Sequence, residues 1–120
     1  MKILDKRVVV TGAASGIGKA LSIAFHEAGA KSLVCVDMNI EGANETAELV
    51  GGIAVQANVA KENEILNVIN EANNLSGGID IFCSNAGIGG VPGFFDAEAE
   101  DWQRIWEINV QSHIHAAKHV

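Results

Sequence analysis

The sequence predicts an α/β fold with a doubly wound parallel sheet. Short apolar runs alternate with longer segments of helical periodicity along the chain. The runs are apolar without interruption, which is typical of strands covered on both faces. Glycine-rich breaks separate the segments. Because crossovers between parallel strands are right-handed, we expect helices on both faces and the strand order 3-2-1-4.

Each element follows from a local signal. Strands are expected where β-branched or alternating apolar residues occur, and helices where apolar residues recur at i, i+3 and i+4. Gly29 suits a helix C-terminus, and Asn39 suits an N-cap. The elements expected in chain order are strand 8–10, helix 17–28, strand 33–37, helix 40–50, strand 53–59, helix 65–75, strand 79–83 and helix 102–117.

The composition of the chain argues against several classes of function. The chain has 120 residues, enough for one domain, with 48% hydrophobic residues and a net charge of −7. The acidic balance and the lack of a basic stripe argue against binding nucleic acid or an anionic membrane. No apolar run approaches the roughly 18 residues of a membrane span, and no signal peptide is evident. A cytoplasmic protein is expected. Cys35 and Cys83 should lie two strands apart as free thiols.

The turn after the first strand predicts an anion site. It reads Thr11-Gly12-Ala13-Ala14-Ser15-Gly16-Ile17-Gly18 and leads directly into a helix, whose N-terminus offers unpaired N–H groups. The Walker A pattern fails because Ala13 replaces its first glycine, which disfavours a phosphate-loop NTPase. The GxGxxG pattern fails at its third glycine. The pattern TGxxxGxG fits.

Three further signals follow in order. Asp37 ends the second strand 19 residues after Gly18, Asn85-Ala86-Gly87 follows the fourth strand, and Asn109-Val110 lies in the last helix. Together with the glycine turn, they cover nearly the whole chain. The sequence resembles the classical short-chain dehydrogenase/reductase family. The resemblance implies that residues 1–120 are the N-terminal portion of a Rossmann-like NAD-binding domain, cut after the fourth strand and its helix.

The resemblance also implies roles for individual residues. Asp37 would bind the adenosine ribose, and its charge favours NAD over NADP. Asn58 stands where relatives usually have aspartate, so adenine would be recognised through a neutral amide. Asn85 would brace the central strands through Thr11. The residues expected to bind the cofactor are Gly12, Ser15, Gly16, Ile17, Gly18, Asp37, Met38, Asn58, Val59, Asn85, Ala86 and Gly87.

The chain contains only part of the set of residues that the family uses for proton transfer. The family needs a tyrosine, a lysine four residues later and a serine, and the chain has no tyrosine. Asn109 matches the family's catalytic asparagine, and the other groups would lie beyond Val120. We therefore expect the cofactor-binding half of an oxidoreductase that transfers hydride between NAD(H) and a small alcohol or carbonyl. The alternative is a non-catalytic module that binds nucleotide or pairs with a longer relative.

The last helix carries the remaining candidates. Trp102 and Trp106 are expected to be packing residues, and relatives suggest a homo-oligomer formed through this helix. His113, His115 and His119 are expected to hold no metal, because no carboxylate or cysteine completes a site around them. The loop 89–95 offers Phe94 and Phe95 as candidate substrate contacts, with loop packing as an equal alternative.

Overall fold

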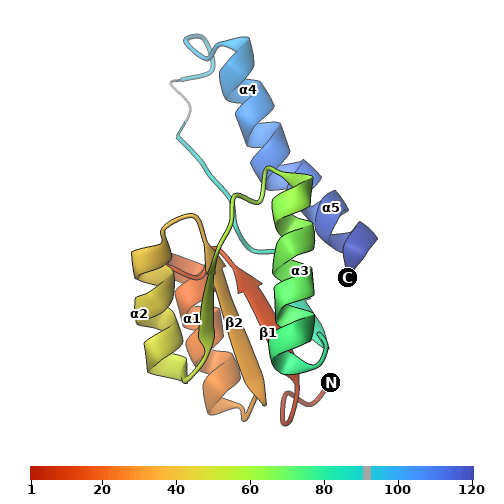
Figure 1. Ribbon diagram of the computed structural model, residues 1–120. Coiled ribbons are helices and arrows are strands. Elements are labelled where there is room, and N and C mark those ends of the chain that lie inside the picture. Colours follow the sequence, from red (N-terminus) through yellow and green to blue (C-terminus); the bar gives the residue numbers. More distant parts are fainter. Residues whose placement is uncertain (91–92) are drawn as a thin grey trace.

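The sheet has the predicted topology. The computed structural model describes residues 1–90 and 93–120 (Figure 1). Its four parallel strands are arranged in the order β3-β2-β1-β4, as predicted. The strands are β1 (Arg7–Thr11), β2 (Ser32–Asp37), β3 (Ile53–Gln56) and β4 (Ile81–Cys83).

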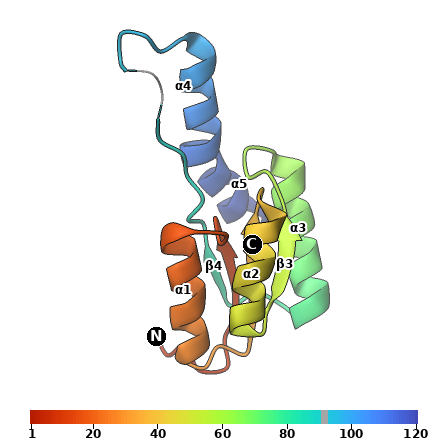
Figure 2. The ribbon, with the colours of Figure 1, turned by 90° about the vertical axis from the view of Figure 1, so that its left-hand side faces the viewer.

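Helices cover both faces of the sheet, so the fold is Rossmann-like (Figures 1 and 2). One face is covered by α1 (Gly16–Glu27) and α2 (Ile40–Val50), and the other by α3 (Glu62–Ser76) and α5 (Ser112–His119). Between β4 and α5, α4 (Ala99–Trp106) projects away from the sheet. No helix in the described part of the chain has the length and apolar character needed to cross a membrane.

The central strands alternate their side chains between two apolar layers. Val8 and Val10 pack on the side of α1 and α2, with Cys35 of the neighbouring strand. Val9 and Val34 pack on the side of α3. Both cysteines are free thiols, and β1 separates their strands as predicted.

Element boundaries follow local hydrogen bonds. Helix α2 spans the predicted residues, and Asn39 caps it by accepting from the N–H of Gly42 at 3.2 Å. Strand β3 is shorter than predicted, because the chain turns where Asn58 Oδ1 accepts from the N–H of Ala60. Strand β4 begins two residues late, after Asp80, whose carboxylate accepts from the backbone N–H of Arg7.

The last helix differs from the prediction. A π-helical turn, η1 (Glu107–Gln111), separates α4 from α5. The predicted apolar face includes His113 and Ala117, which are exposed, whereas Ser112 and Ala116 are buried. Small side chains lie at the buried positions because α5 packs closely against α3. Periodicity of apolar residues therefore indicates the wrong face here.

Candidate dinucleotide site

The glycine turn between β1 and α1 is tightly folded. Gly12 has a φ of +71° and Gly16 a φ of +53°, values that favour glycine. A Cβ on Gly18 would lie 2.0 Å from the carbonyl oxygen of Gly12, so only glycine fits there. A Cβ on Gly16 would meet no atom within 4 Å. Ser15 makes no side-chain capping bond, so the N-terminus of α1 stays open to an anion.

Asp37 is held in place at the end of β2. Its carboxylate accepts from the N–H of Ala14 through Oδ2 and from the N–H of Asn39 through Oδ1, both at 3.0 Å. The first bond ties β2 to the glycine turn. Each oxygen retains a further acceptor site, so the carboxylate can also accept from ligand hydroxyls.

A network around Thr11 joins the ends of β1 and β4. The Thr11 hydroxyl donates to the carbonyl of Cys83 at 3.2 Å and accepts from the N–H groups of Asn85 and Ala86. Asn85 Nδ2 donates to the carbonyl of Thr11 at 3.0 Å. The predicted brace between Asn85 and Thr11 is therefore present.

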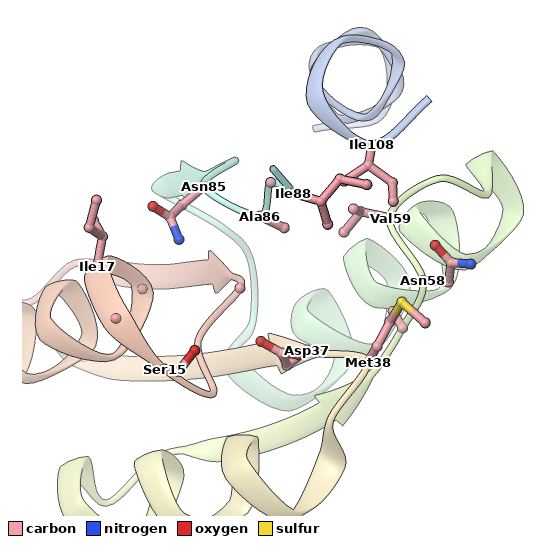
Figure 3. Close-up of a pocket in the computed structure, with 15 residues that line it drawn as sticks. Ser15, Ile17, Asp37, Met38, Asn58, Val59, Asn85, Ala86, Ile88 and Ile108 are labelled. Carbon is pink, nitrogen blue, oxygen red and sulfur yellow. The ribbon is translucent and has the colours of Figure 1, made fainter. Parts of the chain in front are cut away.

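One pocket of about 420 Å³ collects the residues expected to bind the cofactor (Figure 3). All twelve line it, although they come from four separate strand ends. Sequence reasoning missed three further lining residues, Ala57, Ile88 and Ile108. Each is the immediate neighbour of a predicted site residue or motif, and this adjacency is the signal that could have found them.

Asn58 and Met38 lie at one end of the pocket (Figure 3). Gln56 Nε2 donates to the carbonyl of Met38 at 3.0 Å, and the N–H of Asn58 donates to Glu64 Oε2 at 2.7 Å. The bond from Asn58 lowers the pKa of the Glu64 carboxyl, and Lys61 lowers it further. The backbone at this end is therefore held by side chains on both sides.

Asn109 does not line the pocket. Its Oδ1 accepts from the N–H of Ile88 and its Nδ2 donates to the carbonyl of Ile88, both at 2.8 Å. Because both amide atoms bind one backbone unit, Asn109 ties the segment after β4 to the π turn. π turns are often found at functional sites.

The histidines of α5 have acidic and hydroxyl neighbours that the sequence did not indicate. Glu62 Oε1 pairs with Lys118 at 2.7 Å and with His119 at 2.9 Å, and His115 lies 3.6 Å from its other oxygen. Glu62 therefore lies beside two of these histidines, a contact that joins α3 to α5 across the sequence. Lys118 and then His119 lower the pKa of Glu62 to about 2. His113 Nδ1 lies 2.6 Å from Ser84 Oγ.

The described residues contain no group of three His, Cys, Asp or Glu side chains arranged to hold a metal ion. Lys118 occupies the same carboxylate that the histidines approach. The arrangement around Glu62 is therefore an ion-pair cluster that joins α3 to α5.

The aromatic residues near α4 are more exposed than expected. Trp102 and Trp106 are 45% and 50% exposed, so they do not pack inside the described part of the chain. Phe94 contacts Phe95 and Trp102 edge to face, at centroid distances of 5.5 and 6.0 Å. Neither phenylalanine lines the pocket. Val91 and Pro92 of the predicted loop lie outside the described residues.

Known proteins resemble this chain over nearly all of its length. The 7alpha-hydroxysteroid dehydrogenase of Escherichia coli K12 is 35% identical, covering 98% of this chain and 48% of that protein. The glucose 1-dehydrogenase 2 of Bacillus subtilis is 34% identical, covering 97% of this chain and 47% of that protein. A crystal structure of a hydroxysteroid dehydrogenase from Escherichia coli matches with a TM-score of 0.91 and 34% identity, covering 99% of this chain and 52% of that one.

The chain thus spans about half the length of the relatives it matches. Its residues 6–120 match the short chain dehydrogenase family. This match shows that the chain belongs to the short-chain dehydrogenase family of oxidoreductases, and the sheet order and the glycine turn agree with it.

Proposed function

We propose that this chain is the cofactor-binding half of an NAD(H)-dependent alcohol or carbonyl oxidoreductase. The observation that carries the proposal is the pocket, which joins an open helix N-terminus to a fixed carboxylate. Gly16, Ile17 and Gly18 would hold the pyrophosphate with backbone N–H groups, because that end of α1 is electropositive and unobstructed. Asp37 would accept from the adenosine ribose hydroxyls.

The electrostatics of the pocket favour NAD over NADP. Asp37 is the only charged residue among the pocket-lining residues that the structure describes. A 2′-phosphate on the ribose would meet this carboxylate with no lysine or arginine beside it, and two like charges in close contact repel. Ala86 and Gly87 would line the cofactor on the opposite wall, beside the Thr11 network.

Bound NAD supplies hydride chemistry at the nicotinamide ring. This chain would contribute binding and orientation, and Asn109 would act as a positioning residue by fixing Ile88 at the pocket wall. Proton transfer by a tyrosine would have to come from outside these 120 residues, which contain none. The relatives named above suggest hydroxylated small molecules as the substrate class.

The test is a titration of the chain with NADH and NADPH, followed by NADH fluorescence. We expect NADH to bind more tightly than NADPH, and Asp37→Ala to weaken NADH binding about tenfold or more, since it removes charge-assisted hydrogen bonds. Glu45→Ala removes an exposed carboxylate of α2 outside the pocket and serves as the matched control. Equal binding by Asp37→Ala and the unmodified chain would refute the proposal.

A second candidate is a non-catalytic module, and the absence of tyrosine from the sequence favours it for the chain by itself. The module would bind the dinucleotide without oxidising or reducing a substrate. NADH production from alcohols by the purified chain would exclude it. Binding without turnover would support it.

We also propose self-association through α4. A mainly apolar groove along this helix and into η1 is lined by Ala99, Trp102, Gln103, Ile105, Trp106 and Val110. Two half-exposed tryptophans at i, i+4 offer the large flat surface that interfaces use as anchors. Light scattering after size exclusion should show a dimer or larger species that Trp106→Glu converts to monomer. An unmodified chain that is monomeric at high concentration would contradict this.

A further inference from the structure

Helix α2 contacts the glycine turn through a buried hydroxyl. Thr46, in the middle of α2, is fully buried and does not line the pocket. Its Oγ1 donates to the carbonyl of Ala13 at 2.8 Å. A Cβ on Gly42, one helical turn earlier, would lie 2.8 Å from the Cβ of Ala14. Helix α2 therefore lies as close to the turn as its backbone allows, beside α1 (Figure 2).

The Thr46 hydroxyl has one hydrogen to donate and two carbonyls within reach. The second is the carbonyl of Gly42 at 3.1 Å, which lies inside α2, where carbonyls accept from the N–H four residues later. The carbonyl of Ala13 receives no other hydrogen bond among the residues that the structure describes. Since a buried carbonyl without a donor costs free energy, the hydroxyl is needed at Ala13.

The carbonyl of Ala13 and the N–H of Ala14 belong to one peptide group. Thr46 holds its carbonyl, and its N–H donates to Asp37 Oδ2 at 3.0 Å. Because the group is planar, a hydrogen bond at one end fixes the direction of the other end. A donor on the carbonyl also polarises the group, which makes its N–H a stronger donor. Thr46 and Asp37 are therefore linked through this peptide, although they lie on different elements.

The link affects ligand binding if the proposed function holds, because Asp37 would then accept from the ribose hydroxyls. A rotated Ala13–Ala14 peptide would withdraw the N–H that fixes the carboxylate. It would also turn a carbonyl oxygen toward that carboxylate, so that two acceptors would face each other. We propose that Thr46 is a positioning residue for the dinucleotide. From outside the pocket, its hydroxyl keeps this peptide in the orientation that fixes Asp37 for the ribose.

Fluorescence titration of the full chain with NADH tests the role of the hydroxyl. Thr46→Val keeps the shape of the side chain without its O–H and should raise the Kd about fivefold, the loss expected for one hydrogen bond. Thr46→Ser keeps the hydroxyl and should bind within about twofold of the unmodified chain. The control is Val50→Ala, at the buried last residue of α2, beside Gly52. It should lower the urea midpoint and leave the Kd unchanged.

A double-mutant cycle separates positioning from general support of the fold. In an Asp37→Ala background, Thr46→Val should change the Kd by less than about twofold, because the group it positions is gone. Equal losses in both backgrounds would overturn the inference, and so would an unchanged Kd for Thr46→Val.

Two further outcomes are separable. If Thr46→Val does not fold, Gly42→Ala takes its place, because it keeps the hydroxyl but forces α2 away from Ala14. It should weaken NADH binding, and an unchanged Kd would overturn the inference alone. An unmodified chain that does not bind NADH would overturn the proposed function and the inference with it.

Discussion

The segment from β1 to α2 and the segment from β4 to α4 are packed very differently. Strands β1 and β2 bury all their residues except those at the ends, whereas β4 has only partly buried residues. Helix α2 buries five residues, and α4 buries none. The glycine turn and Asp37 are therefore supported by contacts within the first βαβ unit. The segment after β4 is held by the hydrogen bonds of Asn85 and Ala86 to Thr11, by the Asn109–Ile88 pair and by the contacts of α5.

The largest expected effect comes from the well-packed segment. Gly18→Ala would place a Cβ 2.0 Å from the carbonyl oxygen of Gly12, so the turn would have to move. We expect the free energy of unfolding to fall by about 3 kcal/mol or more, as for severe overpacking. Urea denaturation followed by circular dichroism measures this.

A glycine after β4 provides the control for that substitution. A Cβ on Gly89 would meet no atom within 4 Å, and Gly89 does not have a positive φ. Gly89→Ala should change the free energy of unfolding by less than about 0.5 kcal/mol. Similar losses for the two variants would show that the two segments do not differ in packing.

A smaller effect is expected at Asn109. Asn109→Ala removes two hydrogen bonds to Ile88 and leaves part-buried backbone groups unpaired. The free energy of unfolding should fall by about 1–3 kcal/mol. Hydrogen exchange should increase at the amide of Ile88 while the amides of β2 stay protected, because the pair supports only the segment after β4. Uniform loss of protection across the sheet would contradict a local role.

Acid should loosen the contact between α3 and α5. Ion pairing lowers the pKa of Glu62 from its usual 4.5 to about 2, so its contribution to stability is full above about pH 4.5 and is lost as the pH falls toward 2. Glu62→Gln should therefore lose less thermal stability than the unmodified chain between these pH values. The exposed Glu48, which forms no ion pair among the described residues, gives the control Glu48→Gln. Parallel pH profiles for Glu62→Gln and the unmodified chain would argue against the cluster.

The smallest perturbation is labelling of the two thiols. Burial raises the pKa of both Cys35 and Cys83, but Cys35 is fully buried and Cys83 only partly. In native buffer, Cys83 should react with a thiol reagent faster than Cys35, and Cys83→Ser should remove the faster phase. Faster labelling of Cys35 would mean that β2 opens more readily than β4.

Local signals predicted most of the fold and twelve of the fifteen residues that line the pocket. The cap at Asn39, the buried strands and the glycine turn all depend on residues near one another in sequence, and those elements were predicted well. The Glu62 cluster could not be predicted, since it joins residues more than 50 positions apart. The face of the last helix was misjudged because close packing against α3 selects small residues such as Ser112 and Ala116.

The π turn also determines the direction in which Trp102 and Trp106 face relative to α5. Such a turn is equivalent to one extra residue taken into a helix, and each residue of a regular α-helix turns the chain by about 100°. Deleting one residue from Glu107–Gln111 would restore a regular helix and rotate Trp102 and Trp106 by about that angle relative to α5. The number of residues in this turn thus fixes the rotation of α4 relative to α5. A single-codon deletion could redirect the surface without altering either tryptophan.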